Sequence, residues 1–379
     1  IGNRIETPKT PEAYEEVEYT EIVRTPTTGE RWFDTKEPPA DYDYSFAVVG
    51  DTQYINMHAP EQFPKIYDWI LDNVDDKKIK LVAGLGDITE GDYVEQWELA
   101  QAQMTRMDGV VPYSVVRGNH DAAKSFNKYF PYENYVDRLK GSFDGTMLNT
   151  YQEIVIGRIK YLVMVIDYGA DDDVLEWANG VVAAHPDHNV IVTTHGYIDK
   201  DGSLIVDGMA TSDGYNDGDD MWHKFIKKHA NITMVLCGHE LSENIVAVQS
   251  KGENGNTVTQ MLINPQSLDH LNSTERPTGM VCMLYFSDNG KKVEVEYYST
   301  VKQQYFKDVN QFDFEVDVVD NNLAGDIDGD GFIGAKDIAD VRKCLLGTVN
   351  KAYYYDVTGE GDINILDLIR VKKYAAKVS

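Results

Sequence analysis

The chain has 379 residues, enough for one large domain and one small one. Its 63 acidic and 35 basic side chains leave a formal net charge of −28 at pH 7, which argues against nucleic-acid binding because phosphates would be repelled. No apolar run approaches the roughly 18 residues of a membrane span. Three scattered cysteines are too few for a disulfide framework, so we expect a soluble protein without nucleic-acid or membrane partners.

Residues 1–43 are polar and acidic and contain several prolines. We expect an N-terminal extension that either wraps over the next domain or stays mobile, and the sequence does not decide between the two. No signal peptide is visible, but the chain opens at Ile1 rather than Met. We therefore expect an exported protein from which the signal has been removed.

Residues 44–316 predict one α/β domain. Apolar β-like runs alternate there with helical spacing, such as the apolar positions Phe63, Ile66 and Ile70. Continuous apolar strands separated by helices indicate strands that are buried on both faces. Ligands of such sheets bind at the carboxyl ends of the strands.

Five of these apolar runs end in a polar cluster, and we expect the five clusters to share one pocket. They are Asp51 with Gln53, Asp87, Asn119 with His120 and Asp121, His195, and His239. Carboxylate, amide and imidazole groups suit Mn, Fe or Zn, with Mg possible and calcium less favoured. The chain has no G-x-S-x-G, Walker or C-x-x-C pattern that would indicate a rival chemistry.

The ordered set D-x-Q, G-D, G-N-H-D, H and G-H resembles the calcineurin-like metallophosphoesterase superfamily over roughly residues 44–300. The resemblance implies an α/β (α+β) fold of two packed sheets flanked by helices, with one or two divalent metals at the sheet edge and a phosphate-ester substrate. The resemblance implies that Asp51 and Gln53 bind the first ion, that Asp87 bridges the two ions, and that Asn119, His195 and His239 bind the second ion. His120 would face the phosphate, and Asp121 would orient the His120 ring.

Two departures from the family pattern affect the first ion. The usual D-x-H is Asp51-Thr52-Gln53 here, and the usual G-H-x-H ends in Leu241, which cannot bind a metal. The sequence leaves open whether the first ion is labile, whether an oxygen-rich site accepts Mg or Mn, or whether the site is mononuclear. The candidates for a substitute ligand are Glu240, Glu243, Asp269 and His270.

A short linker, residues 317–325, leads to a segment, 326–379, that contains two acidic twelve-residue loops. Oxygen side chains stand at positions 1, 3, 5 and 12 of each loop, and glycine stands at position 6, where a loop around calcium bends sharply. The expected calcium ligands, which include position 7 of each loop, are Asp326, Asp328, Asp330, Phe332 and Asp337 in the first loop, and Asp356, Thr358, Glu360, Asp362 and Asp367 in the second.

This duplicated segment resembles a type I dockerin, a small all-α module. The resemblance implies two bound calcium ions, a cohesin partner on a scaffold protein, and an extracellular place on the cellulosome of an anaerobic bacterium. Asp rather than Glu at position 12 disfavours a calcium-controlled switch. The expected cohesin-binding residues are Ala335, Lys336, Arg342, Lys343, Ile365, Leu366, Lys372 and Lys373.

The sequence thus predicts a secreted, scaffold-borne phosphoesterase acting on a phosphate mono- or diester. The alternative is a catalytically weak relative that binds a phosphorylated ligand, which Gln53 and Leu241 suggest. The natural substrate is not indicated.

Overall fold

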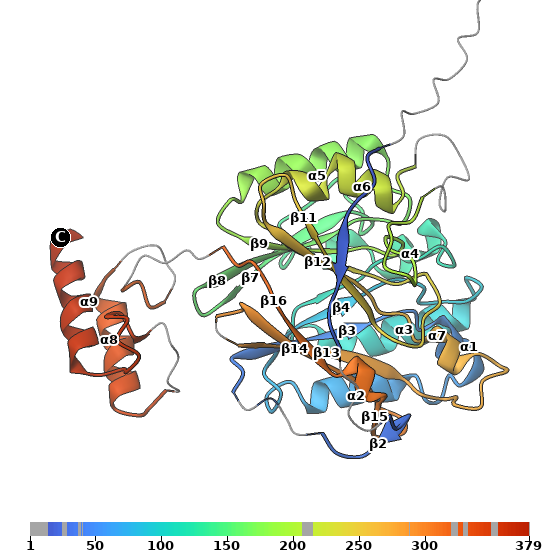
Figure 1. Cartoon of the computed structure of the whole chain (residues 1–379). Coiled ribbons are helices and arrows are strands. Elements are labelled where there is room, and N and C mark those ends of the chain that lie inside the picture. The colour runs from blue at the N-terminus through green and yellow to red at the C-terminus, as the bar shows by residue number, and fades with distance from the viewer. Residues whose placement is uncertain are drawn as a thin grey trace, which may run out of the picture.

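The computed structural model describes residues 14–24, 29–36, 39, 41–206, 215–287, 289–319, 325–328, 333–349 and 355–378. Two expected calcium ligands, Asp330 and Phe332, lie outside these ranges. Within them the chain forms two β-sheets packed face to face, with helices on the outer faces (Figure 1), and a separate pair of C-terminal helices. The predicted α/β two-sheet fold is confirmed.

The first sheet has the strand order β1-β11-β12-β10-β9-β8-β7-β6. Its strands are β1 (Tyr19–Glu21), β6 (Gly141–Ser142), β7 (Thr150–Ile156), β8 (Ile159–Val165), β9 (Asn189–Thr193), β10 (Ile232–Cys237), β11 (Val246–Lys251) and β12 (Thr257–Leu262). Strands β8, β9, β10 and β12 run parallel to one another, and the outer strands are antiparallel.

The second sheet has the order β2-β15-β14-β13-β3-β4-β5, and β16 also pairs with β14. Its strands are β2 (Trp32–Phe33), β3 (Tyr44–Val49), β4 (Ile79–Gly84), β5 (Tyr113–Ser114), β13 (Met280–Ser287), β14 (Lys292–Ser299), β15 (Gln304–Phe306) and β16 (Phe312–Glu315). Strands β3, β4 and β5 are parallel. All residues of β3, β9 and β10 are buried, as expected for strands covered on both faces.

Three apolar layers hold the large domain together. The layer between the sheets includes Phe46 and Leu236. A second layer packs helices α1 (Gln53–His58), α2 (Pro64–Asp72), α3 (Val94–Met104) and α4 (Ala123–Tyr129) on one sheet, and a third packs α5 (Asp172–Ala184) and α6 (Gly218–Lys224) on the other. Helices α5 and α6 begin at Asp171 and Asp217, whose carboxylates accept the backbone N–H three residues ahead.

The described part of the N-terminal extension wraps over the domain. Strand β1 pairs with β11 of the first sheet, and β2 pairs with β15 of the second. Of the two alternatives left by the sequence, the structure therefore supports wrapping for these residues. The two-residue strand β2 is too short to show a strand pattern in the sequence.

The chain leaves the large domain through β16 and the residues that follow it. Strand β16 pairs with β14 of the second sheet. Four residues beyond β16, the Val319 N–H donates to Asn189 Oδ1 on β9 of the first sheet, at 2.7 Å. The exit segment is therefore bonded to both sheets.

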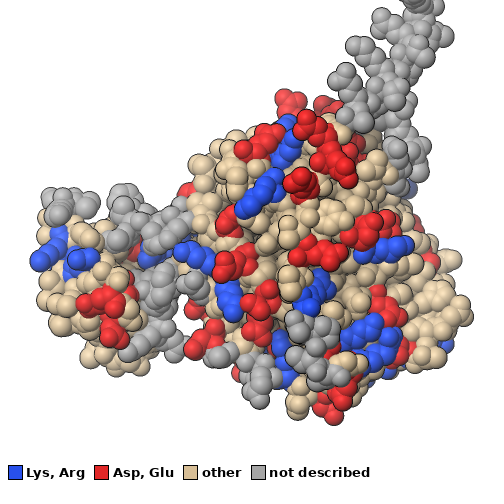
Figure 2. All heavy atoms as spheres, viewed as in Figure 1, with Lys and Arg blue, Asp and Glu red and all other residues tan. Residues whose placement is uncertain are grey.

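The C-terminal helices, α8 (Ala335–Leu345) and α9 (Ile365–Val378), pack on each other beside the large domain (Figure 1). Their core includes Val341, Cys344, Leu368 and Val371. The face of the molecule in Figure 2 carries acidic and basic side chains interspersed. Within the described part of the chain, no helix has the length and apolar character needed to cross a membrane.

Candidate metal centre at the strand ends

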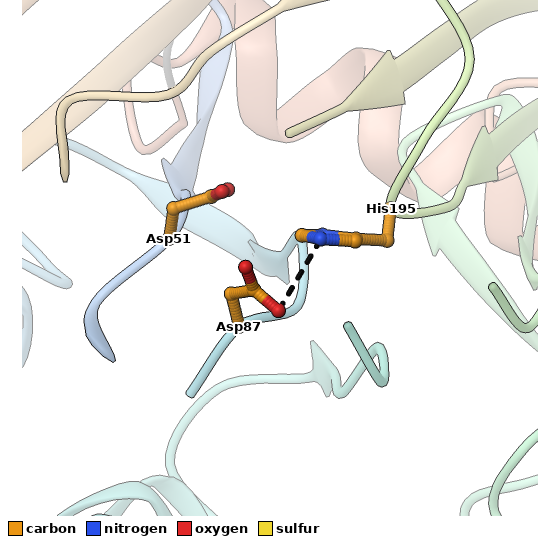
Figure 3. A group of neighbouring side chains, drawn as sticks. All are labelled: Asp51, Asp87 and His195. Atoms are coloured by element: carbon orange, nitrogen blue, oxygen red, sulfur yellow. Dashed lines mark ion pairs between the residues drawn. The ribbon is translucent and has the colours of Figure 1, made fainter. Parts of the chain in front are cut away.

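The five predicted clusters follow β3, β4, β5, β9 and β10, and the structure brings their side chains together. Asp51, Asp87 and His239 have positive φ angles of 34°, 49° and 73°. Non-glycine residues rarely adopt this left-handed conformation, which costs free energy. The sharp turns aim these side chains back across the strand ends, and Figure 3 shows Asp51 and Asp87 pointing toward the His195 ring.

The glycines of the G-N-H-D and G-H motifs make room for the acidic side chains. A Cβ on Gly118 would lie 2.0 Å from Asp87 Oδ1, and a Cβ on Gly238 would lie 2.0 Å from Asp51 Oδ1. Any other residue at these two positions would therefore displace a carboxylate. The recurring glycine of each motif has a steric cause at this site.

On one side of the site, four possible ligand atoms crowd together. His195 Nε2 lies 3.3 Å from Asp87 Oδ1 and 3.0 Å from Asn119 Oδ1. His239 Nδ1 lies 2.9 Å from Asn119 Oδ1 and 3.3 Å from His195 Nε2. The Leu85 carbonyl accepts from His195 Nδ1 at 2.8 Å, which turns the Nε2 atom toward the cluster.

These spacings suit a transition metal. Ligands at about 2.0–2.1 Å from a tetrahedral ion lie about 3.3 Å apart. The separations of 2.9–3.3 Å among Asp87, Asn119, His195 and His239 approach that value. Oxygen and imidazole lone pairs this close repel one another unless a proton or a metal ion stands between them. The histidine side therefore fits the second ion that the family resemblance implies.

The ionisation of the two histidines shows the same need for a cation. Burial acts to lower the pKa of His195, but the adjacent Asp87 outweighs it and raises that pKa to about 9. Burial, together with the His195 ring, lowers the pKa of His239 to about 4. Without a metal, a proton on His195 thus supplies the positive charge that the cluster requires.

The other side of the site is built differently. Gln53 Nε2 donates to Asp87 Oδ2 at 3.0 Å and to Gln266 Oε1 at 2.7 Å. Gln266 Nε2 donates to Asp51 Oδ2 at 3.2 Å, and the His239 N–H donates to the same oxygen at 3.0 Å. Among the described residues, Asp51 Oδ1 and Gln53 Oε1 are buried without a hydrogen-bond partner. Amide N–H donors thus face the carboxylates where the resemblance implies imidazole ligands, so this side offers a metal fewer donor atoms than the histidine side.

Two of the four candidate substitutes for the missing histidine are engaged by other partners. Leu241 is 55% exposed. Glu243 pairs with Arg31 and Lys307, and Asp269 accepts from Thr278. Of the other two candidates, Glu240 lies beside the histidine side, with its Oε1 3.9 Å from His239 Nε2, and His270 Nδ1 accepts from the Asn272 N–H.

His120 lies at the open edge of the cluster. Its N–H donates to Asp87 Oδ1 at 3.0 Å, and its Nδ1 lies 2.8 Å from the Glu90 carbonyl oxygen. The ring is about one-third exposed. Partial burial lowers the pKa of His120, but the Glu90 carbonyl and nearby Asp87 outweigh it, and the pKa is raised. The ring is thus placed to meet a ligand as a cation.

The expected role of Asp121 is corrected. Its carboxylate is fully buried and accepts backbone N–H bonds from Ile88, Thr89 and Gly118. Asp121 therefore joins the loop after β4 to the loop after β5, and the Glu90 carbonyl orients the His120 ring. The sequence could not show this, because adjacent residues in a sharp turn point in different directions.

Sequence reasoning missed three neighbours of the site. Gln266 follows β12 and could have been recognised as a sixth polar cluster after an apolar run. Glu90 lies three residues beyond Asp87. Tyr168 places its ring 5.5 Å from that of His195 and 5.3 Å from that of His239, and no motif indicated it.

The first calcium loop brings its described acidic residues together. Asp326, Asp328 and Asp337 offer oxygen atoms within 4.8 Å of one another. In the second loop, Asp356 accepts from the N–H groups of residues 359–361, and Asp367 accepts from Thr358. Glu360 and Asp362 are exposed. The expected cohesin-binding residues are all exposed on α8 and α9: Ala335, Lys336, Arg342, Lys343, Ile365, Leu366, Lys372 and Lys373.

Comparison with known proteins agrees with these features. The sequence model described as calcineurin-like phosphoesterase matches residues 44–243, and the one described as dockerin type I domain matches residues 324–375. The uncharacterized protein YvnB of Bacillus subtilis (strain 168) is 29% identical over 287 residues, which are 73% of this chain and 21% of that protein. The chain thus spans about a fifth of this relative.

Similar solved structures include a dimetal phosphatase from Danio rerio, with a TM-score of 0.46 and 10% identity over 73% of this chain and 100% of that one. Another is the purple acid phosphatase PPD1 from yellow lupin (Lupinus luteus) seeds, with a TM-score of 0.44 and 15% identity over 72% of this chain and 53% of that one.

Proposed function

We propose, from the premise that this chain belongs to the calcineurin-like phosphoesterase family and carries a type I dockerin domain, that it hydrolyses phosphate mono- or diesters with the help of a divalent metal. The observation that carries the proposal is the crowding of Asp87, Asn119, His195 and His239, each of which has a possible ligand atom within 3.3 Å of such an atom on at least one of the others. When bound, a divalent ion polarises a phosphoryl oxygen and lowers the pKa of water.

The residues of the chain supply positioning and proton transfer. His120, held through its backbone and its Nδ1, presents Nε2 to a phosphate oxygen. A protonated ring there stabilises developing negative charge and can donate its proton to the leaving oxygen. Asp121 keeps the His120 loop fixed against the Asp87 loop, so the ring does not need to be ordered when the substrate binds.

The dockerin domain would attach this activity to a scaffold. Ile365 and Leu366 are exposed apolar side chains, 58% and 49% accessible, on the first turn of α9, and basic side chains stand further along both C-terminal helices. An exposed apolar group beside cations is typical of a protein-binding surface. We place the cohesin contact at these positions, and we place the protein outside the cell on a cellulosome.

Hydrolysis of bis-p-nitrophenyl phosphate and of p-nitrophenyl phosphate tests the activity. Each substrate is supplied with Mn, Zn, Fe or Mg in turn. We expect turnover with at least one metal, on the order of 100-fold or more above an Asp87→Ala variant. Rates equal to that variant with every metal would contradict hydrolysis of both ester classes.

A second function is favoured by the amide contacts of Gln53 and Gln266 and by Leu241: binding a phosphorylated ligand without hydrolysis. Calorimetric titration with inorganic phosphate separates the two functions. Phosphate binding without turnover of either ester would favour this second function.

A further inference from the structure

We propose that the Gln53 and Gln266 amides occupy the place of the first metal ion, so that the strand ends hold a single transition-metal ion on the histidine side. The inference goes beyond the proposed function, because it concerns how many ions the site holds and not which reaction follows. It stands on the hydrogen bonds between four buried side chains, Asp51, Gln53, Asp87 and Gln266.

Gln53 uses both amide hydrogens at this site. One points to Asp87 Oδ2 and the other to Gln266 Oε1. An amide nitrogen carries no lone pair for a metal. Asp87 divides its two oxygens between the two sides, because Oδ1 lies beside His195 and Oδ2 accepts from Gln53. The oxygen that a first ion would share is therefore already bound to a donor.

Gln266 completes the arrangement. Its Oε1 accepts from Gln53, and its Nε2 donates to Asp51 Oδ2. The result is a continuous chain from Asp51 through the two amides to Asp87. Hydrogen bonds to ionised carboxylates are stronger than those between neutral groups. The amide pair thus offsets part of the negative charge that a cation would otherwise neutralise.

The orientation of the amides decides between one ion and two. If both amides rotated, Gln53 Oε1 would face Asp87 Oδ2 and Gln266 Oε1 would face Asp51 Oδ2, with acceptor against acceptor on each side. Only a hard cation between them would make that state favourable. The observed orientation gives both amide nitrogens an acceptor without a cation, and it leaves Gln53 Oε1 and Asp51 Oδ1 without a hydrogen-bond partner among the described residues. Exposed Leu241 offers no ligand for a first ion.

The histidine side has enough ligands for its own ion. Asp87, Asn119, His195 and His239 supply four donor atoms. A carboxylate oxygen of Asp51 also lies within 4.8 Å of ligand atoms of Asp87 and His195, and it is near enough to serve as a fifth.

Manganese counting tests the inference. The full chain is kept in calcium so that its C-terminal loops are filled, loaded with excess Mn(II) and desalted. Manganese per chain is then measured by elemental analysis and by electron paramagnetic resonance. We expect one ion with the six-line spectrum of isolated Mn(II), and none in His239→Ala. Two ions with an exchange-coupled spectrum, or none in the unsubstituted chain, would overturn the inference.

The double variant Gln53→His/Leu241→His asks whether the amide is what excludes the second ion. We expect it to bind two coupled manganese ions, while the control Gln249→His on β11 keeps one. A double variant that folds, by circular dichroism, but still holds one ion would overturn the role given to Gln53. If the double variant does not fold, the number of manganese ions bound by the unsubstituted chain tests the inference. One manganese ion per chain without any ester turnover would contradict the proposed function but not this inference. Two ions per chain with turnover would contradict this inference but not the proposed function.

Discussion

The strand-end site and the C-terminal calcium loops gather acidic side chains in opposite ways. In the large domain the ligands stand at the ends of strands buried on both faces. Hydrogen bonds to the Leu85 carbonyl and from His120 and Gln53 fix them. In the C-terminal segment, the carboxylates are carried by two loops that flank a small apolar core around Val341 and Val371. The fold of the large domain positions the first site, whereas metal binding at the second site must stabilise the C-terminal helices.

The difference follows from the size of each core. Three extended apolar layers stabilise the sheets independently of any ion. Two short helices bury too little apolar surface to overcome the repulsion among Asp326, Asp328 and Asp337 when no cation is bound. The same chemical event, loss of a metal, should therefore have unequal structural effects in the two regions.

Calcium removal gives the largest expected effect. Chelation with EGTA should unfold α8 and α9 while the sheets stay folded, because only the loops depend on calcium for their shape. Hydrogen exchange read by mass spectrometry checks this region by region. Unchanged protection of residues 335–345 and 365–378 after chelation would refute the comparison.

Substitution of Asp87 should slow the proposed catalysis without unfolding the sheets. Asp87→Asn keeps the shape of the side chain but weakens metal binding, and we expect kcat to fall by on the order of 10²–10³. The exposed Asp313→Asn on β16 is the matched control and should leave the rate unchanged. A variant that melts as the unsubstituted chain does but retains its rate would remove Asp87 from the site.

Replacing the edge histidine should separate chemistry from metal binding. His120→Gln removes the proton donor but none of the four crowded ligand atoms, so we expect kcat to fall about 100-fold with the metal content unchanged. His229→Gln is the control, because this histidine is bonded to Asn179 and lies before the start of β10, at the opposite end of that strand from His239. Loss of metal in His120→Gln would show that the ring acts as a ligand.

The smallest expected effect is a dependence of stability on pH that arises in the large domain alone. Burial raises the pKa of Asp269 from 3.8 to about 6. The folded state therefore holds this proton more tightly, and the resulting stability is present below pH 3.8 and is lost as pH rises through about 6. Asp269→Asn should flatten this part of the profile, as measured by urea unfolding between pH 4 and 7. A profile that keeps its slope would assign it to another group.

The sequence predicted the sheets well because buried parallel strands leave long apolar runs, and it predicted the convergence of Asp51, Asp87, Asn119, His195 and His239 because strand ends meet at one edge. It could not predict that Gln53 would present nitrogen rather than oxygen, since that choice depends on Gln266, 213 residues away. Nor could it separate Asp121 from His120, because their partners are set by the backbone turns. The predicted domain boundaries and the other site roles stay predictions.

The exit of the chain from the large domain has a mechanical consequence. If a protein is tethered through its C-terminal module, a pulling force acts first on the residues that follow β16. The hydrogen bonds of β16 to β14 and of Val319 to Asn189 divide that load between the two sheets. Tension on the C-terminal segment would thus load these hydrogen bonds, which join both sheets, before it reached the strand ends. The arrangement of the metal-binding side chains would then stay undistorted under that tension.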